Sequence, residues 1–383
     1  MNTPVRCRQA VILLCNKDAV LHTQLLNLHI NELIRQGFED IILLTSQAEL
    51  PQCISTRRCT IILAEGQVDS DALRNAAGFL NDQFLLVHGD CFFDFNYRAL
   101  EAVQRHTEGI MVTMALKAGM GRSRFSYASV LDGKVTGLID TDNPIHRSSH
   151  IGTGVYFCDR AILTRVPESA GSFERGTVTA LVAAGTVACV VGEGCFVAEP
   201  ALTREQYEVI TQRPALFLDR DGTINCDQGY THKVEDMKLI DGALELIRTY
   251  CDRGWHVFVV TNQSGIARGY FGFDAVERFH DALRNACVDA GGFIHDFEVS
   301  PYHESGCLEP YAVANHRTRK PNPGMLLDLM EKWSVIKADS LMVGDKNIDV
   351  LAAEAAGIRG LLFDSHDLMQ FAVANGLFES QTS

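Results

Sequence analysis

The stretch FLDRDGTIN, from Phe217 to Asn225, places two carboxylates, Asp219 and Asp221, at the end of an apolar run. The apolar residues are typical of a buried strand, and the Gly-Thr pair that follows is typical of a turn. In α/β proteins with a parallel sheet, the carboxyl ends of the strands are where the chemistry is placed. The stretch therefore predicts a site at the end of a buried parallel strand.

Beyond this stretch, strand and helix patterns alternate regularly. The strand-like runs read WHVFVVTN, IHDFEVS, SLMVGD and IRGLLFD, and the helix-like segments between them include GALELIRTYCDRG, DAVERFHDALRNACVDAG, PGMLLDLMEKW and IDVLAAEAAG. Repeated βαβ units with such apolar strands predict a parallel sheet covered on both faces, and right-handed crossovers make it doubly wound. Residues 213–383 are therefore predicted to form one α/β domain.

Residues 1–212 show a different pattern. A buried strand is predicted over Gln9–Cys15 and a helix over Leu21–Gln36, and further strands follow in EDIILLTS, TIILAE, DQFLLVHGD and GIMVTMALKA. The stretch VLDGKVTGLI predicts a hairpin that turns at Asp132-Gly133. Strands over HIGTGVYFC and TVACVV precede a last helix, for which Thr203 is the expected cap. We expect a mixed-sheet α/β domain that ends before Pro214.

Composition narrows the possible partners and locations. The 383 residues carry a net charge of −14, which argues against general nucleic-acid binding but leaves a small anionic substrate possible. No apolar run approaches the ~20 residues of a membrane helix, and the short run AVILLC leads straight into charged residues, unlike a secretory signal. Twelve cysteines without a CxxC pair fit buried thiols in a reducing compartment. We predict a cytoplasmic protein without nucleic-acid or membrane partners.

Further polar residues of the second domain lie at predicted strand ends or helix starts. Thr261 ends one strand, Asp345 ends another in LMVGDKNID, with Asp349 four residues on, and Lys320 precedes a predicted helix in RTRKPNPG. Carboxylates that meet at one edge repel one another unless a hard cation such as Mg²⁺ joins them. With a hydroxyl and an ammonium, they suit phosphoryl transfer. Each motif alone could be turn chemistry, but their order and context favour a site.

The four motifs FLDRDGTIN, VVTNQSGIARGYF, RKPNPGM and VGDKNID resemble those of haloacid dehalogenase (HAD)-type phosphatases. The resemblance is to the branch that includes D-glycero-D-manno-heptose 1,7-bisphosphate phosphatase and histidinol-phosphate phosphatase, and it runs from about Pro214 to Ala374. It implies a Mg²⁺-dependent phosphomonoesterase with a doubly wound, Rossmann-like sheet.

The resemblance also implies a role for each motif residue. Asp219 is the nucleophile that forms an aspartyl-phosphate, and Asp221 protonates the leaving oxygen and then activates water. Mg²⁺ is held by Asp219, the backbone carbonyl of Asp221 and Asp345. Thr261 donates to a phosphoryl oxygen, and Lys320 neutralises the nucleophile and the transferring group.

Other polar residues near the motifs are candidates for binding the substrate. Arg268, Arg319 and Lys346 could hold a second phosphate, although each could equally be a solvent-facing charge. Asn262 and Gln263 are expected to shape the loop around the transferred phosphate.

Many members of the phosphatase branch that this chain resembles carry a zinc loop before the lysine motif. Here that region reads SPYHESGCLEPYAVANHRTRKP, and the four ligand positions become Ser300, Tyr302, His316 and Thr318. A displaced set of His303, Cys307 and His316 has irregular spacing and lacks a fourth ligand. Structural zinc needs four nitrogen or sulfur ligands, so zinc is not expected.

The first domain resembles the GT-A-like sugar-1-phosphate nucleotidyltransferases. FLLVHGDCFFDFNYRAL matches their metal-binding strand end, with Asp90 at the ligand position, and HIGTGVYFCDRAIL and TREQYEVI match later elements. The glycine-rich phosphate loop is replaced by LLCNKDAVLH, where Asp18 adds negative charge, and Ala198 fills the second metal position, beside Glu199. We expect an inactive domain retained for packing, homo-oligomerisation or binding.

These features favour hydrolysis of a sugar bisphosphate, with heptose 1,7-bisphosphate as the leading substrate and heptose 1-phosphate as the product. The alternatives are a phosphatase for another small phosphate, such as histidinol phosphate, or a sugar-phosphate-binding scaffold with an inactive first domain. A bifunctional phosphatase and transferase is the least favoured reading.

Overall fold

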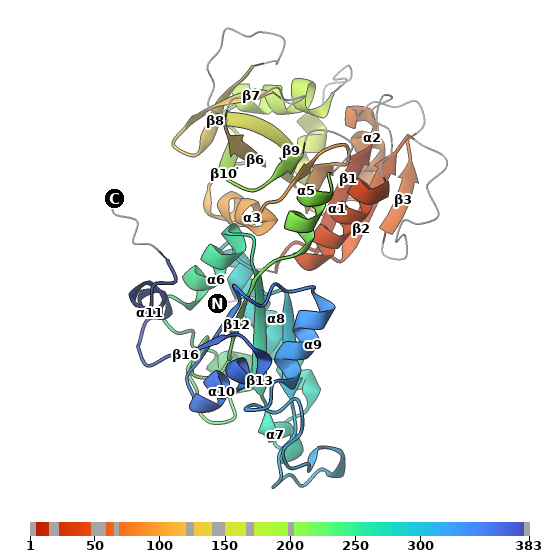
Figure 1. Ribbon diagram of the computed structural model, residues 1–383. Helices are drawn as coiled ribbons and strands as arrows, with labels where there is room; N and C mark the ends of the chain where they lie inside the picture. Colours follow the sequence, from red (N-terminus) through yellow and green to blue (C-terminus); the bar gives the residue numbers. More distant parts are fainter. Residues whose placement is uncertain are drawn as a thin grey trace. The chain divides into compact units, whose positions relative to one another are not determined.

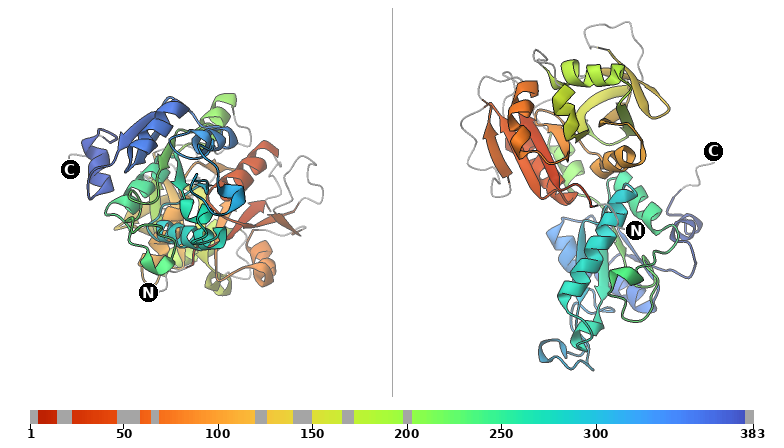
Figure 2. Two further views of the ribbon diagram at one scale, coloured as in Figure 1. Left: turned by 90° about the horizontal axis from the view of Figure 1, so that it is seen from below. Right: turned by 180° about the vertical axis from the view of Figure 1, so that it is seen from behind.

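The computed structural model describes residues 5–14, 23–46, 59–64, 69–119, 126–139, 150–165, 172–197 and 203–378. These residues divide into two compact units, one over Val5–Tyr207 and one that begins at Glu208 (Figures 1 and 2). The change from one unit to the other falls inside helix α5 (Arg204–Thr211). The domain boundary expected from the sequence, between residues 212 and 213, lies at the end of the same helix.

The second unit is built on a five-stranded sheet in the order β14-β13-β12-β15-β16, and all neighbouring strands are parallel. The strands are β12 (Ala215–Leu218), β13 (His256–Asn262), β14 (Asp296–Ser300), β15 (Leu341–Gly344) and β16 (Arg359–Leu362). The order places β12 at the centre, with later strands on both sides. The predicted doubly wound sheet is confirmed.

Helices cover both faces of this sheet (Figure 1). One face packs against α6 (Ala243–Asp252), α8 (Phe273–Asp289) and α11 (Leu368–Ala374), and the other against α9 (Gly324–Lys332) and α10 (Asn347–Ala356). Alternate residues of β12 supply the two cores: Leu216 and Leu218 point to the first, and Phe217 to the second. Burial of both faces explains why its strands are continuously apolar.

The first unit contains a nine-stranded sheet in the order β3-β2-β1-β4-β9-β6-β10-β8-β7. Strands β1 to β4 pair in parallel, whereas β9 runs antiparallel to both β4 and β6, so the predicted mixed sheet is confirmed. The strands are β1 (Gln9–Leu14), β2 (Asp40–Thr45), β3 (Cys59–Leu63), β4 (Gln83–His88), β6 (Val112–Ala118), β7 (Tyr127–Leu131), β8 (Lys134–Ile139), β9 (His150–Asp159) and β10 (Val187–Gly192).

Local signals in this unit behave as the sequence predicts. Strands β7 and β8 form the expected hairpin, and Asp132 and Gly133 at its turn have φ angles of 49° and 72°. Positive φ at both central residues is what a type I′ turn requires. Thr203 caps α5, since its Oγ1 accepts from the backbone N–H of Gln206 at 3.1 Å.

Several elements of the first unit were not predicted. They are α2 (Asp69–Asn75), α3 (Tyr97–His106), α4 (Thr179–Ala183) and a two-stranded sheet of β5 (Phe92–Phe93) and β11 (Phe196–Val197). The predicted first helix is α1 (Thr23–Arg35). The residues Asp18, Ala198 and Glu199, on which the expected loss of transferase activity rests, lie outside the described residues.

Two findings bear on membranes and disulfides. Among the described residues, no helix combines the length and the apolar character that crossing a bilayer requires. The cysteines in the same part of the chain form no disulfides with one another, and Cys226 and Cys307 are exposed.

Candidate active site

The predicted motif residues meet at the carboxyl edge of the second sheet. Asp219 and Asp221 follow β12, Thr261 ends β13 and Lys346 follows β15. Lys320 comes from the loop between β14 and α9. A cleft of about 300 Å³ opens here, and its walls include Asp219, Asp221, Asp227, Tyr230, Thr261, Asn262, Gln263, Arg319, Lys320, Lys346 and Asp349. Eight of the residues expected at the site therefore share one cleft: Asp219, Asp221, Thr261, Asn262, Gln263, Arg319, Lys320 and Lys346.

The centre of the cleft is the contact between Lys320 and Asp219. The Nζ atom of Lys320 donates to Oδ1 of Asp219 at 2.6 Å and to the carbonyl of Val260 at 2.7 Å, and it lies 2.7 Å from Oδ1 of Asp349. Burial alone lowers the pKa of Lys320, but the carboxylates of Asp219 and Asp349 outweigh burial and raise it. The lysine is therefore held as a cation beside Asp219.

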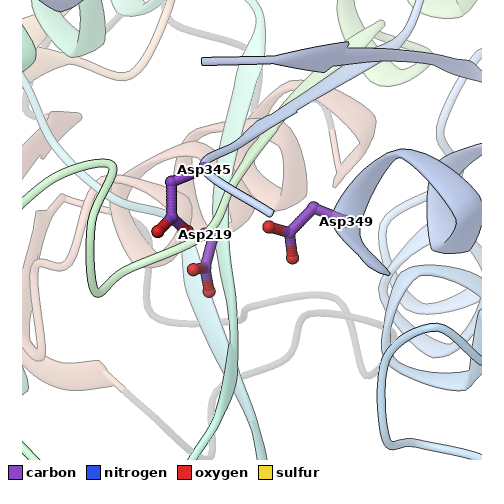
Figure 3. A group of neighbouring side chains, drawn as sticks. All are labelled: Asp219, Asp345 and Asp349. Atoms are coloured by element: carbon purple, nitrogen blue, oxygen red, sulfur yellow. The ribbon is translucent and has the colours of Figure 1, made fainter. Parts of the chain in front are cut away.

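Three carboxylates point toward one another at this edge, those of Asp219, Asp345 and Asp349 (Figure 3). Their nearest oxygens all lie within 4.8 Å of one another. Burial, and then the charge of Asp219, raises the pKa of Asp345 to about 6. Gly222 has a φ of 92°, and a Cβ there would collide with Asp345. Gly222, the glycine that follows Asp221, thus makes room for the carboxylate of Asp345.

Asp349 belongs to this group, although no role was expected for it from the sequence. It lies in the first turn of α10, where its Oδ2 accepts from the backbone N–H of Lys346 at 3.0 Å. The available signal was its position four residues after Asp345, one helical turn beyond the strand end. Asp221 does not join the group through its side chain; the role expected for it was that of a backbone carbonyl ligand.

The carboxylate of Asp221 is held by several donors. Arg220 donates to both oxygens, with Nη2 at 2.7 Å from Oδ2 and 3.0 Å from Oδ1. Asn225 Nδ2 donates to Oδ1 at 3.0 Å, and Gln263 Nε2 donates to Oδ2 at 2.7 Å. Gln263 also donates to Thr261 Oγ1 at 2.9 Å, so it joins two of the predicted catalytic residues.

Asn262 fixes the lysine loop against the end of β13. Its Nδ2 donates to the carbonyl of Lys320 at 3.1 Å, and its Oδ1 accepts from the backbone N–H of Lys320 at the same distance. This reciprocal pair positions the lysine backbone, and Asn262 also lines the cleft.

The three cations expected to bind a second phosphate occupy different places. Arg319 and Lys346 line the cleft, and Lys346 lies 3.4 Å from Asp227 and 3.5 Å from Asp345. Arg268 is not among the lining residues, and its Nη2 contacts the ring of His303 at 3.4 Å. Burial, and then the charge of Arg268, lowers the pKa of Arg319. The two guanidinium groups therefore repel each other, although only that of Arg319 lines the cleft.

The residues at the four positions of the zinc ligands, Ser300, Tyr302, His316 and Thr318, contact one another through ring stacking and hydrogen bonds. The rings of Tyr302 and His316 stack with centroids 3.5 Å apart, Nδ1 of His316 lies 2.9 Å from Thr318 Oγ1, and that hydroxyl lies 3.4 Å from Ser300 Oγ. Across the described residues, the group of Asp219, Asp345 and Asp349 is the one set of three side chains placed to hold a metal ion. His303, Cys307 and His316 form no such set.

The second half of the chain is similar in sequence to known phosphatases. The HAD-hydrolase-like family profile matches residues 317–367. The D-glycero-β-D-manno-heptose-1,7-bisphosphate 7-phosphatase of Rhodopseudomonas palustris is 42% identical over 170 residues, which are 44% of this chain and 93% of the relative. The D,D-heptose 1,7-bisphosphate phosphatase of B. bronchiseptica, solved with magnesium and phosphate, is 28% identical with a TM-score of 0.36 over 44% of this chain and 90% of its own.

A structure of another class matches as well. A putative glucose-1-phosphate thymidylyltransferase from Bacillus anthracis is 15% identical with a TM-score of 0.43, over 52% of this chain and 93% of its own.

The profile match falls on the lysine loop, β15 and α10, which carry Lys320, Asp345 and Asp349. The second unit is therefore a hydrolase of the haloacid dehalogenase class, and the motif residues lie at the carboxyl edge of its sheet. Within that class, the chain belongs to the D-glycero-β-D-manno-heptose-1,7-bisphosphate 7-phosphatase family, because its second half matches nearly the whole length of a member at 42% identity.

Proposed function

We propose that this protein hydrolyses D-glycero-D-manno-heptose 1,7-bisphosphate to heptose 1-phosphate and inorganic phosphate through an aspartyl-phosphate. The observation that carries the proposal is the buried pair of Asp219 and Lys320 at the carboxyl edge of the sheet. A carboxylate is a weak nucleophile toward a phosphate dianion because both are negative. The ammonium 2.6 Å from Asp219 offsets this repulsion and is placed to follow the charge of the transferring group.

Asp219 and Asp221 divide the chemistry in this proposal. An oxygen of Asp219 attacks phosphorus, the bond to the sugar oxygen breaks, and that oxygen takes a proton from Asp221. Asp221 then takes a proton from water as the water oxygen attacks phosphorus, and the bond to Asp219 breaks to release phosphate. Gln263 donates to both Asp221 and Thr261 and so holds the Thr261 hydroxyl near Asp221. That hydroxyl supplies a donor for a phosphoryl oxygen.

The cluster of Asp219, Asp345 and Asp349 fits a magnesium ion. Asp219 and Asp345 offer hard oxygens close together, and Oδ1 of Asp345 is buried without a hydrogen-bond partner among the described residues. Asp219, Asp345 and the backbone carbonyl of Asp221 would hold the ion, and Asp349 lies beside them. When bound, it supplies positive charge that offsets the negative charge of the phosphoryl group. Zinc has no part in the proposal, because Ser300, Tyr302 and Thr318 lack the thiolate or imidazole ligands of a structural site.

The cations beside the cleft support a substrate with two phosphates. Arg319 lines the cleft near a second guanidinium, that of Arg268, and an anion between them would relieve their mutual repulsion. Lys346, which also lines the cleft, adds a third charge. A phosphate that is not transferred can therefore be held while the other lies against Asp219.

The proposal assigns catalysis to residues 213–383 and no nucleotidyl transfer to residues 1–212, which could instead form contacts in a homo-oligomer. It also places the protein in the cytoplasm, where free thiols are stable. The absence of disulfides among the described cysteines supports that location.

A phosphate-release screen tests the proposed function. The full-length protein is incubated with Mg²⁺ and, separately, with heptose 1,7-bisphosphate, other sugar bisphosphates and histidinol phosphate, with the variant Asp219→Asn as control. We expect the highest kcat/KM for the heptose and a loss of several orders of magnitude in the variant. A preference for histidinol phosphate would reassign the substrate. Phosphate release that survives in Asp219→Asn would overturn the mechanism, and binding without turnover would indicate a scaffold.

A further inference from the structure

Arg220, between the two aspartates of the cleft, is completely buried. Its Nη2 donates to Asp221 and, at 2.6 Å, to the carbonyl of Thr231, and its guanidinium lies over the ring of Phe279. The remaining nitrogen, Nη1, lies 3.4 Å from Nε2 of His280. An arginine always donates, so Nε2 of His280 must present its lone pair as the acceptor. Arg220 thus joins Asp221 to a histidine 60 residues further along the chain.

His280 is kept neutral at this position. It lies in α8 and is fully buried, and its ring stacks on Phe297 with centroids 4.2 Å apart. Burial, and then the charges of Arg220 and Arg284, lowers the pKa of His280 to about 2. A charged imidazole there would face two guanidinium groups, whereas the neutral ring accepts from one of them.

The protonation of His280 on Nδ1 has a cost in folding free energy that packing alone does not explain. With the lone pair on Nε2, the ring proton is on Nδ1, which is buried and finds no acceptor among the described residues. A buried donor without a partner destabilises the folded protein. An apolar side chain would fill the same space without that cost, so the acceptor for Arg220 is what the histidine adds.

We infer that His280 is a positioning residue that holds Arg220, and through it the carboxylate of Asp221, in the orientation for proton transfer to the leaving oxygen. The inference rests on the proposed function. In the first step the O–H bond of protonated Asp221 breaks, and the proton passes to the sugar oxygen as its bond to phosphorus breaks. Without the acceptor on His280, Nη1 of Arg220 loses one of the contacts that fix the guanidinium, so the direction in which Arg220 holds Asp221 is less tightly defined.

The test compares two leaving groups in the full-length protein. A sugar alkoxide leaves only when it is protonated, whereas p-nitrophenolate leaves without a proton. The kcat/KM value covers the steps up to departure of the leaving group, so the later attack of water does not affect it. His280→Leu removes the acceptor and keeps apolar volume, and His280→Gln retains an acceptor.

For His280→Leu, we expect kcat/KM on heptose 1,7-bisphosphate to fall by about tenfold or more. On p-nitrophenyl phosphate we expect a change of less than about twofold, and His280→Gln should stay within about threefold of wild type on both. Should His280→Leu not fold, His280→Met removes the acceptor with a more adaptable side chain.

Equal losses of kcat/KM on both substrates in His280→Leu, or no loss on either, would overturn the role of His280. A loss of more than about threefold on heptose 1,7-bisphosphate in His280→Gln would overturn it as well. Those outcomes presuppose an active wild-type protein that depends on Asp219. If wild type releases no phosphate, or Asp219→Asn does so as well as wild type, the proposed function itself fails.

Discussion

The Nζ atom of Lys320 lies 2.7 Å from Oδ1 of Asp349, and both side chains are only 1% exposed. Asp349 is therefore the second carboxylate that keeps the buried lysine charged, beside Asp219. The same residue receives the backbone N–H of Lys346 and so orders the start of α10. One side chain thus links the lysine loop to the strand end that carries Asp345.

We predict that Asp349→Asn lowers kcat by about 10- to 100-fold, a range typical of residues that orient a metal or catalytic group. The amide still accepts from the backbone N–H of Lys346, so α10 should keep its start, but the charge opposite Lys320 is lost. The measurement is kcat at saturating Mg²⁺. The matched control is Asp328→Asn, which removes an exposed carboxylate that pairs with Arg317. Wild-type kcat in Asp349→Asn would show that Asp219 alone suffices to hold the lysine.

Magnesium should stabilise the second unit. Asp219, Asp345 and Asp349 repel one another in the metal-free protein, and ligand at 100 times its Kd adds about 2.7 kcal/mol to the free energy of unfolding. For a unit of this size, that corresponds to a Tm increase of roughly 5–10 °C. Both tryptophans, Trp255 and Trp333, lie in the second unit, so their fluorescence reports its unfolding.

Asp345→Asn provides the control for the magnesium experiment. It removes one of the repelling carboxylates, so we expect a higher Tm without metal and little further increase with Mg²⁺. An undiminished increase in this variant would place the bound ion elsewhere.

We predict that the purified protein contains no stoichiometric zinc and that zinc chelators leave its activity unchanged. Tyr302 and His316 stack, and Thr318 joins His316 to Ser300, so the loop is ordered by contacts that need no metal. Elemental analysis of the protein decides the point. One zinc ion per chain would mean that His316 binds it with partners outside these four positions.

The second unit could be predicted from sequence almost element by element, because its strands are continuous apolar runs and every motif except the lysine motif follows directly on a strand. The contact of Arg220 with His280 could not be predicted, since it joins residues 60 positions apart and depends on how α8 packs on the sheet. Helix α3 escaped prediction because its buried face carries Arg98 and Glu101, an ion pair that hides the apolar periodicity. Strands β5 and β11 have two residues each, too few to show a period.

The neutral His280 should make the stability of the second unit depend on pH. The pKa of this histidine is about 2 in the folded protein and near 6.5 when unfolded, so the unfolded state binds more protons between these values. Stability therefore falls as pH drops below about 6.5, by roughly 2 kcal/mol between pH 7 and pH 5. Urea unfolding followed by tryptophan fluorescence at the two pH values measures this change in stability. In His280→Gln the loss should be smaller by that amount, and an identical loss would show that the folded protein can protonate His280.

The last prediction concerns the first unit, which we expect to transfer no nucleotide. Asp90 follows β4 at the carboxyl edge of that sheet, as a metal ligand should. The sequence supplies Ala198 at the second ligand position, and LLCNKDAVLH contains no glycine to bring backbone amides onto a triphosphate. Transfer requires that a polyphosphate be both positioned and neutralised, and the sequence provides for neither.

The measurement is pyrophosphate release from the full-length protein, incubated with heptose 1-phosphate and each nucleoside triphosphate in turn. We expect no release above a protein-free control, and the same result for Asp90→Ala. Because the phosphatase could hydrolyse the triphosphate or the released pyrophosphate to orthophosphate, the assay is repeated in Asp219→Asn, where that hydrolysis is removed. Sustained pyrophosphate release that persists in Asp219→Asn and disappears in Asp90→Ala would make the protein bifunctional. A working transferase would then have to hold its metal with Asp90 and a ligand other than residue 198, because alanine offers no side-chain donor.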